Sequence, residues 1–173
     1  MRLLLMRHGI AAPFGNGVQT DAQRPLTEEG LQKTRAAAQG LQICESQLDF
    51  IASSPLLRAR QTADIVRDQY SRSVSARKAP SPQIWPELET ADYTGMMRRL
   101  HEVDLNATIL CTGHEPGLSR FVAQLLTASP DGLQMEFKKA AVCALELDYA
   151  FDAPHATLLY HLAPKQLRLL GRD

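Results

Sequence analysis

Short apolar runs alternate with amphipathic helical segments along the chain, and this alternation constrains the fold more than any other feature. The stretch 2–6 predicts a strand that is buried on both faces, and the stretches 48–53 and 107–113 predict two more strands. Between the strands, apolar residues recur at intervals of three and four over 27–42 and 56–70, which indicates helices. Strands that alternate with helices predict a three-layer α/β/α sandwich with a mostly parallel sheet.

Local signals predict where several elements begin. Thr27 is expected to cap the first helix. Ser54 is expected to cap the second helix, with Pro55 at the first helical position, where its missing N–H costs nothing. The proline-broken stretch 78–88 is expected to hold at most a short strand near Ile84.

The rest of the chain completes the expected fold. Residues 10–25 contain glycine and proline in a polar setting and predict a surface loop. Helices are expected over 92–103 and 117–128. The alternating segments 141–148 and 156–163 predict a C-terminal β-hairpin.

Composition argues against several classes of protein. Lysine plus arginine and aspartate plus glutamate number 19 each, so the zero net charge does not suggest nucleic acid or a membrane surface as a partner. The three cysteines are odd in number and widely spaced, which disfavours a disulfide framework and favours a reducing compartment. The apolar run 3–6 is too short for a signal sequence or a membrane span. We therefore expect residues 1–173 to form one domain of a monomeric, cytoplasmic protein.

Charged and polar residues gather where the predicted strands end. Arg7, His8 and Gly9 follow the first strand, and His114 follows the strand that ends at the glycine turn. Arg58 lies in the first turn of the helix after the second strand. Ligands of parallel sheets bind beyond the carboxyl ends of the strands, so these residues are expected to converge. Taken singly, each is more typical of an ordinary strand end, turn or solvated charge.

The convergence predicts phosphoryl transfer. The guanidinium groups of Arg7 and Arg58 offer planar forks that suit phosphate oxygens. A neutral imidazole such as that of His8 can attack phosphorus while the cations stabilise the oxygens in the transition state. Gly9 would let the substrate or the backbone approach closely.

Other chemistries lack their motifs. A cysteine phosphatase needs an arginine six positions after its cysteine, but Gly117 stands six positions after Cys111. The sequence contains no G-x-x-x-x-G-K-[ST], no H-E-x-x-H and no G-x-S-x-G. The histidines show no paired ligand spacing, so no metal site is expected.

Three blocks of the sequence resemble the signature blocks of the histidine phosphatase superfamily, the phosphoglycerate mutase-like proteins. They are LMRHGIA at 5–11, SSPLLRARQTA at 53–63 and TGHEPGL at 112–118. The short length and the block RPLTEEG at 24–30 resemble the small SixA-type branch of phosphohistidine phosphatases. The resemblance implies a phosphoglycerate mutase-like fold.

The resemblance also implies roles for individual residues. His8 would be the nucleophile that becomes phosphorylated, and Arg7, Arg58 and His114 would form the phosphate pocket. Arg24 would reach in from the loop as a further phosphate ligand. Neither a metal ion nor a cofactor would be needed.

The general acid is less well defined by the resemblance. Larger relatives use a glutamate after the third strand, and Glu87 is the nearest match here, with Glu89 two residues further on. The small branch often lacks a dedicated acid, and the alternative for Glu87 is a solvated loop carboxylate. Glu115 stands where the small branch often has asparagine.

Three functions remain open at this point. The first is a phosphohistidine phosphatase that acts on a phosphorylated protein through phospho-His8, in an open site, because no long insertion forms a cap. The second is a phosphatase of small phosphate esters, such as sugar or nucleotide phosphates, with Glu87 as the acid. The third is a non-catalytic module that recognises phosphate, against which the intact His8 argues because binding would need only the arginines.

Overall fold

The fold is that of a computed structural model, which describes residues 1–15, 17–72, 79–148 and 155–172. Residue 78 of the predicted 78–88 stretch lies outside the described residues. In chain order the elements are β1 (Arg2–Arg7), the 3₁₀ helix η1 (Asp21–Gln23), α1 (Glu28–Cys44), β2 (Phe50–Ser53), α2 (Leu57–Ser71), β3 (Gln83–Ile84), α3 (Glu87–Thr90), α4 (Tyr93–His101), β4 (Thr108–Gly113), α5 (Gly117–Thr127), β5 (Val142–Asp148), β6 (His155–Leu162) and α6 (Pro164–Leu170). Within the described ranges, the helices are too short or too polar to cross a lipid bilayer.

The six strands form one sheet in the order β3-β2-β4-β1-β5-β6. The pairings β2–β3, β2–β4 and β1–β4 are parallel, whereas β5 is antiparallel to both β1 and β6. The mostly parallel sheet and the C-terminal hairpin are therefore confirmed. In the β1–β4 ladder Arg7 lies opposite Gly113, so His8 and His114 leave the sheet side by side.

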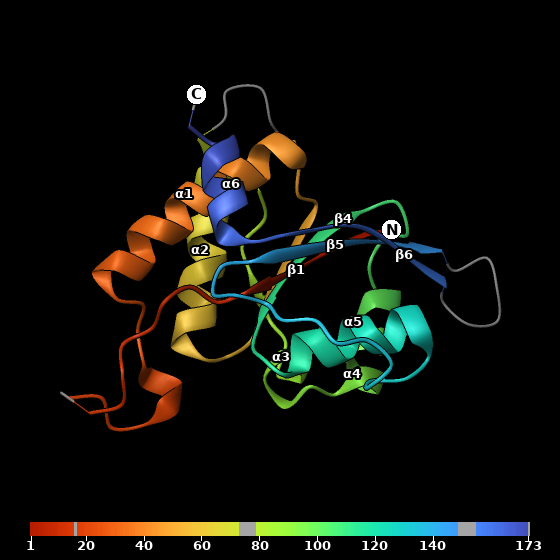
Figure 1. The fold of residues 1–173 in the computed structure, drawn as a ribbon, viewed down its shortest axis with the longest axis horizontal. Helices are drawn as coiled ribbons and strands as arrows, with labels where there is room; N and C mark the ends of the chain where they lie inside the picture. The colour runs from red at the N-terminus through yellow and green to blue at the C-terminus, as the bar shows by residue number, and fades with distance from the viewer. Residues whose placement is uncertain (16, 73–78, 149–154, 173) are drawn as a thin grey trace.

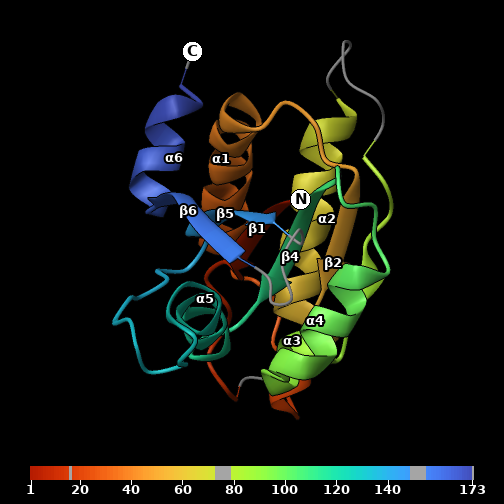
Figure 2. The ribbon, with the colours of Figure 1, turned by 90° about the vertical axis from the view of Figure 1, so that its right-hand side faces the viewer.

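Helices cover both faces of the sheet and complete the predicted three layers (Figure 1). Helices α1, α2 and α6 lie on one face, and α3, α4 and α5 lie on the other (Figure 2). Successive side chains of β1 enter opposite cores: Leu3 and Leu5 pack with the second group of helices, and Leu4 and Met6 with the first. All four are fully buried, which explains why β1 is apolar at every position from Leu3 to Met6 rather than at alternate ones.

Two expected helix caps have different outcomes. The Thr27 side chain accepts a hydrogen bond from the Gly30 N–H at 3.0 Å, so the predicted cap of α1 is confirmed. The predicted Ser54 cap of α2 is wrong, because α2 begins at Leu57 and its N-cap residue, Leu56, makes no side-chain cap. The Ser54 hydroxyl is instead within 2.7 Å of Nε2 of His114, which keeps it at the sheet edge.

The last helix, α6, was not expected from the sequence, and it packs closely on α1. A Cβ atom added at Gly40 of α1 would overlap the backbone carbonyl oxygen of Leu167 in α6. Leu167 is fully buried in the same core as Leu41. The absence of a side chain at Gly40 therefore allows the two helices to meet.

We predict that Gly40→Ala destabilises the protein, although alanine is normally about 1 kcal/mol better than glycine inside a helix. The added methyl group meets backbone rather than a movable side chain, and overpacking of this kind typically costs about 1–3 kcal/mol. Chemical denaturation should report a lower free energy of unfolding, while Arg35→Ala, at an exposed position of the same helix, should change it little. A Gly40→Ala variant as stable as the parent would contradict the prediction.

Candidate active site

The carboxyl ends of β1 and β4 bring the two candidate histidines together. The His8 backbone N–H donates to the Gly113 carbonyl at 3.1 Å, and the imidazole centroids of His8 and His114 are 5.0 Å apart. Arg58, in the first turn of α2, directs its Nε toward Nε2 of His8 at 3.3 Å. The structure thus gathers residues that are 50 or more positions apart in the chain.

The hydrogen bonds of His8 determine its tautomer. His8 as a residue is 7% exposed, and its Nδ1 lies 2.7 Å from the backbone oxygen of Gly9. A carbonyl oxygen only accepts, so Nδ1 carries the proton and Nε2 keeps its lone pair. The Nε–H of Arg58 points at that lone pair. Nε2 of His8 is therefore the ring atom that can act as a nucleophile, once an incoming group displaces the Arg58 N–H from its lone pair.

Burial keeps both imidazoles neutral. It lowers the pKa of His8 from 6.5 to about 3, with a further contribution from the positive charges of Arg58 and Arg7, although the hydrogen bond to Gly9 opposes the shift. Burial likewise lowers the pKa of His114 to about 4, again assisted by Arg58. At neutral pH two uncharged rings therefore lie among fixed cations.

Two buried polar atoms of the site lack a partner among the described residues: Nε of Arg7 and Nδ1 of His114. In the tautomer with the ring proton on Nδ1, the Ser54 hydroxyl donates to Nε2 of His114 while it accepts from the Leu56 N–H. In that tautomer both unpartnered atoms are donors. Buried donors without acceptors are costly, and they fit an oxyanion such as a phosphoryl group.

Asp21 is a site residue that the sequence reasoning did not identify. Its backbone oxygen accepts from Nη1 of Arg58 at 2.8 Å, and its Oδ2 accepts from Nη2 of the same guanidinium at 2.9 Å. Its Oδ1 accepts from Arg24 at 2.8 Å, so Arg24 reaches the site through Asp21. The hydrogen bonds from Arg24 and Arg58 hold the pKa of the Asp21 carboxyl below its usual value. The only sequence signal was an aspartate three positions before Arg24 in a polar loop.

The structure places a side chain close to Gly9, where we predicted the substrate or the backbone. A Cβ atom at Gly9 would overlap Oγ1 of Thr34 in α1. The Gly9 N–H donates to Oγ1 of Thr62 at 3.1 Å. Gly9 thus lets α1 and α2 close around the turn that holds His8.

The candidate acid Glu87 lies at the start of α3. Its Oε1 accepts from Nε of Arg99 at 3.2 Å, and its Oε2 is buried without a partner among the described residues. Within the described part of the chain, no hydrogen bond or ion pair joins Glu87 to His8 or His114. Glu89 is exposed to solvent.

Glu115 supports the site indirectly. Its carboxylate accepts from the Ser119 hydroxyl at 2.6 Å and from the Phe137 N–H at 3.1 Å. The carbonyl oxygen of Phe137 in turn accepts from Nη1 of Arg7 at 2.5 Å. Glu115 therefore holds the segment that orients Arg7.

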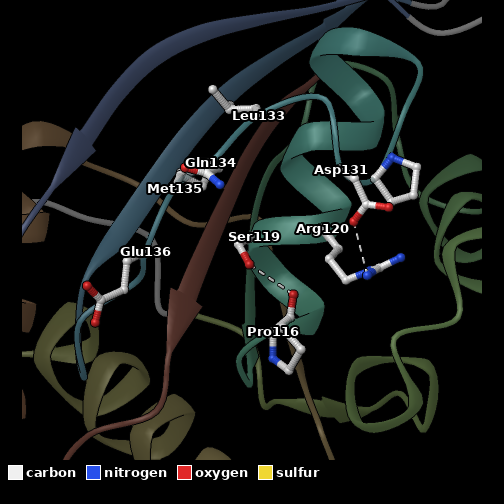
Figure 3. A pocket seen from close by; sticks show the side chains of 9 residues that line it. Pro116, Ser119, Arg120, Asp131, Leu133, Gln134, Met135 and Glu136 are labelled. Carbon is white, nitrogen blue, oxygen red and sulfur yellow. Dashed lines mark hydrogen bonds and ion pairs between the residues drawn. The ribbon is translucent and has the colours of Figure 1, made fainter.

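A cavity of about 600 Å³ lies beside α5, but none of Arg7, His8, Arg58 and His114 lines it. Figure 3 shows its lining, where Arg120 pairs with Asp131 at 3.2 Å. Neither histidine of the site lines it. Among residues 1–15, 17–72, 79–148 and 155–172, no group of three or more histidine, cysteine, aspartate or glutamate side chains is placed to hold a metal ion.

Comparison with known proteins identifies the class to which this fold and site belong. The pattern of the histidine phosphatase superfamily (branch 1) matches residues 3–96, and the chain is a member of that superfamily. Its fold is the phosphoglycerate mutase-like fold of these phosphatases. Membership supports phosphatase activity.

Comparison with individual relatives shows which members of the superfamily this chain resembles. The chain is 27% identical over 172 residues to the phosphohistidine phosphatase SixA of Escherichia coli, and the match covers 98% of each chain. It superposes on the structure of the protein histidine phosphatase SixA complexed with tungstate with a TM-score of 0.78 and 27% identity, covering 96% of this chain and 99% of the other. A putative alpha-ribazole-5'-P phosphatase from Escherichia coli shares the fold, with a TM-score of 0.70 at 22% identity and coverage of 95% and 97%.

We predict that Asp21→Ala lowers kcat/KM about 10-fold, mostly through kcat, because Arg58 loses the carboxylate that orients its guanidinium beside His8. Asp21→Asn, which keeps a side-chain oxygen acceptor, should lose less. The side chain is 57% exposed, so thermal unfolding should barely change. Steady-state kinetics and melting curves provide the measurement, and Asp64→Ala, at a surface ion pair of α2, is the control. Unchanged kinetics in Asp21→Ala would refute the positioning role.

We predict that the rings of His8 and His114 remain neutral between about pH 5 and pH 8. Burial disfavours the imidazolium, so each pKa lies below its usual 6.5 and the rings gain protons only in more acidic solution. Nitrogen-15 NMR should show a protonated Nδ1 and a bare Nε2 for His8, with signals assigned from His8→Gln and His114→Gln. A titration midpoint near 6.5 for His8 is the outcome that contradicts this electrostatic description.

Proposed function

We propose that this protein removes the phosphoryl group from phosphohistidine on another protein, through a covalent intermediate on His8. The observation that carries the proposal is the state of His8: a buried, neutral imidazole whose Nε2 lone pair is oriented by the Gly9 carbonyl and faced by Arg58. A nucleophile needs that lone pair, whereas a module that only binds phosphate does not.

The reaction proceeds in two displacements. In the first, the lone pair of His8 Nε2 forms a bond to phosphorus as the bond from phosphorus to the substrate imidazole breaks. The electron pair of that bond stays on the departing nitrogen, and a protonated phosphohistidine ring leaves as neutral imidazole. In the second, water attacks phosphorus, the electron pair of the P–Nε2 bond returns to Nε2, and inorganic phosphate leaves as H2PO4⁻ with both protons of the water.

The cations of the site stabilise the transferring group. Arg7, Arg58 and His114 supply donors to its oxygens, and Arg24 joins them from the loop through Asp21. Fixed donors of this kind favour the charge of the transition state without reorganisation during the reaction. We propose that these side chains make a metal ion unnecessary. Cys44, Cys111 and Cys143 are free thiols, which supports a cytoplasmic location.

The chemistry of the leaving group and the contacts of Glu87 favour phosphohistidine as the substrate. An imidazole can carry its own proton away, whereas an alkoxide from an ester needs a general acid. The described contacts of Glu87 direct one carboxylate oxygen to Arg99. Similarity to SixA over nearly the whole chain supports the same substrate class. The second candidate is a small phosphate ester, favoured by the buried, unpartnered Oε2 of Glu87, which would then act as the acid.

We predict that Glu87→Gln and Glu89→Gln leave kcat/KM for a phosphohistidine protein nearly unchanged. A general acid typically contributes about 10²- to 10⁴-fold, so an enzyme that depends on either carboxylate would lose that factor. The test measures kcat/KM of the parent and both variants on a phosphohistidine-bearing protein and on p-nitrophenyl phosphate.

His8→Ala is the control for the covalent route and should lose turnover by orders of magnitude while retaining vanadate binding through the arginines. Added chelator should leave the parent rates unchanged. A hundredfold loss with phosphohistidine in Glu87→Gln would show that an acid is required and would favour the small-ester function. Full activity of His8→Ala would refute the mechanism.

A further inference from the structure

A second cavity, of about 480 Å³, adjoins the candidate active site, and half of its ten lining residues are basic. Its wall comes from α1, from the segment before β5 and from α6, and Arg7 belongs both to this wall and to the candidate phosphate site. The charged residues that line it are Arg7, Lys33, Lys138, Lys139, Arg168 and Glu136. Five cations thus face one carboxylate, and we call this feature the basic cavity.

The positive charge is local and largely uncompensated. The chain as a whole carries equal numbers of acidic and basic residues, so the cluster does not reflect a basic protein. Lys33 pairs with Glu29 of its own helix. Lys138, Lys139 and Arg168 form no ion pair or side-chain hydrogen bond with any other described residue. Their charges are therefore available to an anionic ligand.

We infer that the basic cavity binds acidic side chains that flank the phosphohistidine of the protein substrate. The inference rests on the proposed function, because it assumes that the phosphoryl group enters the site beside Arg7. Such a segment would place its phosphohistidine at His8 and its carboxylates along α1 and α6.

The kind of cation favours carboxylates of a protein over a second phosphate of a small molecule. Lys138 and Lys139 are exposed and present point charges on flexible stems, which suit several carboxylates spread over a segment. A single phosphate favours a fixed, convergent set of donors. The volume lies within the range of about 300–1,000 Å³ that ligand pockets occupy, so it admits a few side chains rather than a domain face.

Complementary charge of this kind acts mainly on association. It raises the rate of productive encounter and makes it sensitive to salt, because exposed charges are screened beyond roughly 10 Å at 0.1 M ionic strength. The effect should therefore appear in kcat/KM and not in kcat.

The test uses two synthetic peptides that each contain one phosphohistidine and differ only in flanking residues, glutamate in one and glutamine in the other. We expect the parent protein to show a kcat/KM about 10-fold higher for the glutamate peptide at low salt, with the difference falling at about 0.5 M salt. Lys138→Glu and Arg168→Glu should each reduce this preference to less than about threefold while leaving the glutamine peptide unaffected. Lys165→Glu is the matched control, since it reverses an exposed charge of α6 outside the cavity and should preserve the preference.

The outcomes separate the inference from the proposed function. Equal kcat/KM for the two peptides in the parent overturns the basic cavity as a recognition site and leaves the phosphohistidine function intact. An equal loss of preference in Lys165→Glu and Lys138→Glu overturns it too, because long-range charge alone would then explain the preference. Turnover of p-nitrophenyl phosphate with neither peptide hydrolysed overturns the proposed function and the inference together.

Discussion

The parallel pairing of β1 with β4 is the constraint on which the rest of the structure depends. Their register places Arg7 opposite Gly113, so the turns that follow carry His8 and His114 to the same point at the sheet edge. β1 is held in this position because Leu3–Met6 are all buried between two helical layers. A one-residue slip would exchange the side chains of the two cores, so the packing of the strand also protects the geometry of the site.

Burial then gives the site its electrostatic character. An exposed histidine beside two arginines would still be protonated over part of the physiological pH range, whereas the buried His8 stays neutral and keeps its lone pair. The same environment leaves donors of Arg7 and His114 without acceptors, which suits the oxygens of a phosphoryl group. Burial of His8 among the arginines therefore gives the site both an uncharged nucleophile and a positively charged phosphate pocket.

Substrate preference depends on features around this centre. The proposed phosphohistidine reaction needs little help with its leaving group, which agrees with a Glu87 carboxylate held by Arg99. The basic cavity shares Arg7 with the candidate active site and would select the sequence around the phosphorylated histidine. Arg7 would then contribute both to phosphoryl transfer and to recognition of the protein substrate.

Local patterns in the sequence determined the alternation of strands and helices, the C-terminal hairpin and the cap at Thr27, because hydrophobic periodicity and capping act over a few residues. They also marked His8, Arg58 and His114 as neighbours, since strand ends of a parallel sheet share one edge. Only the tertiary structure decided that Asp21 clamps Arg58, that Ser54 serves His114 instead of capping α2, and that α6 closes over Gly40. Those contacts join residues from 37 to 127 positions apart. Hydrophobic periodicity carries no information over such separations, so packing alone determines these contacts.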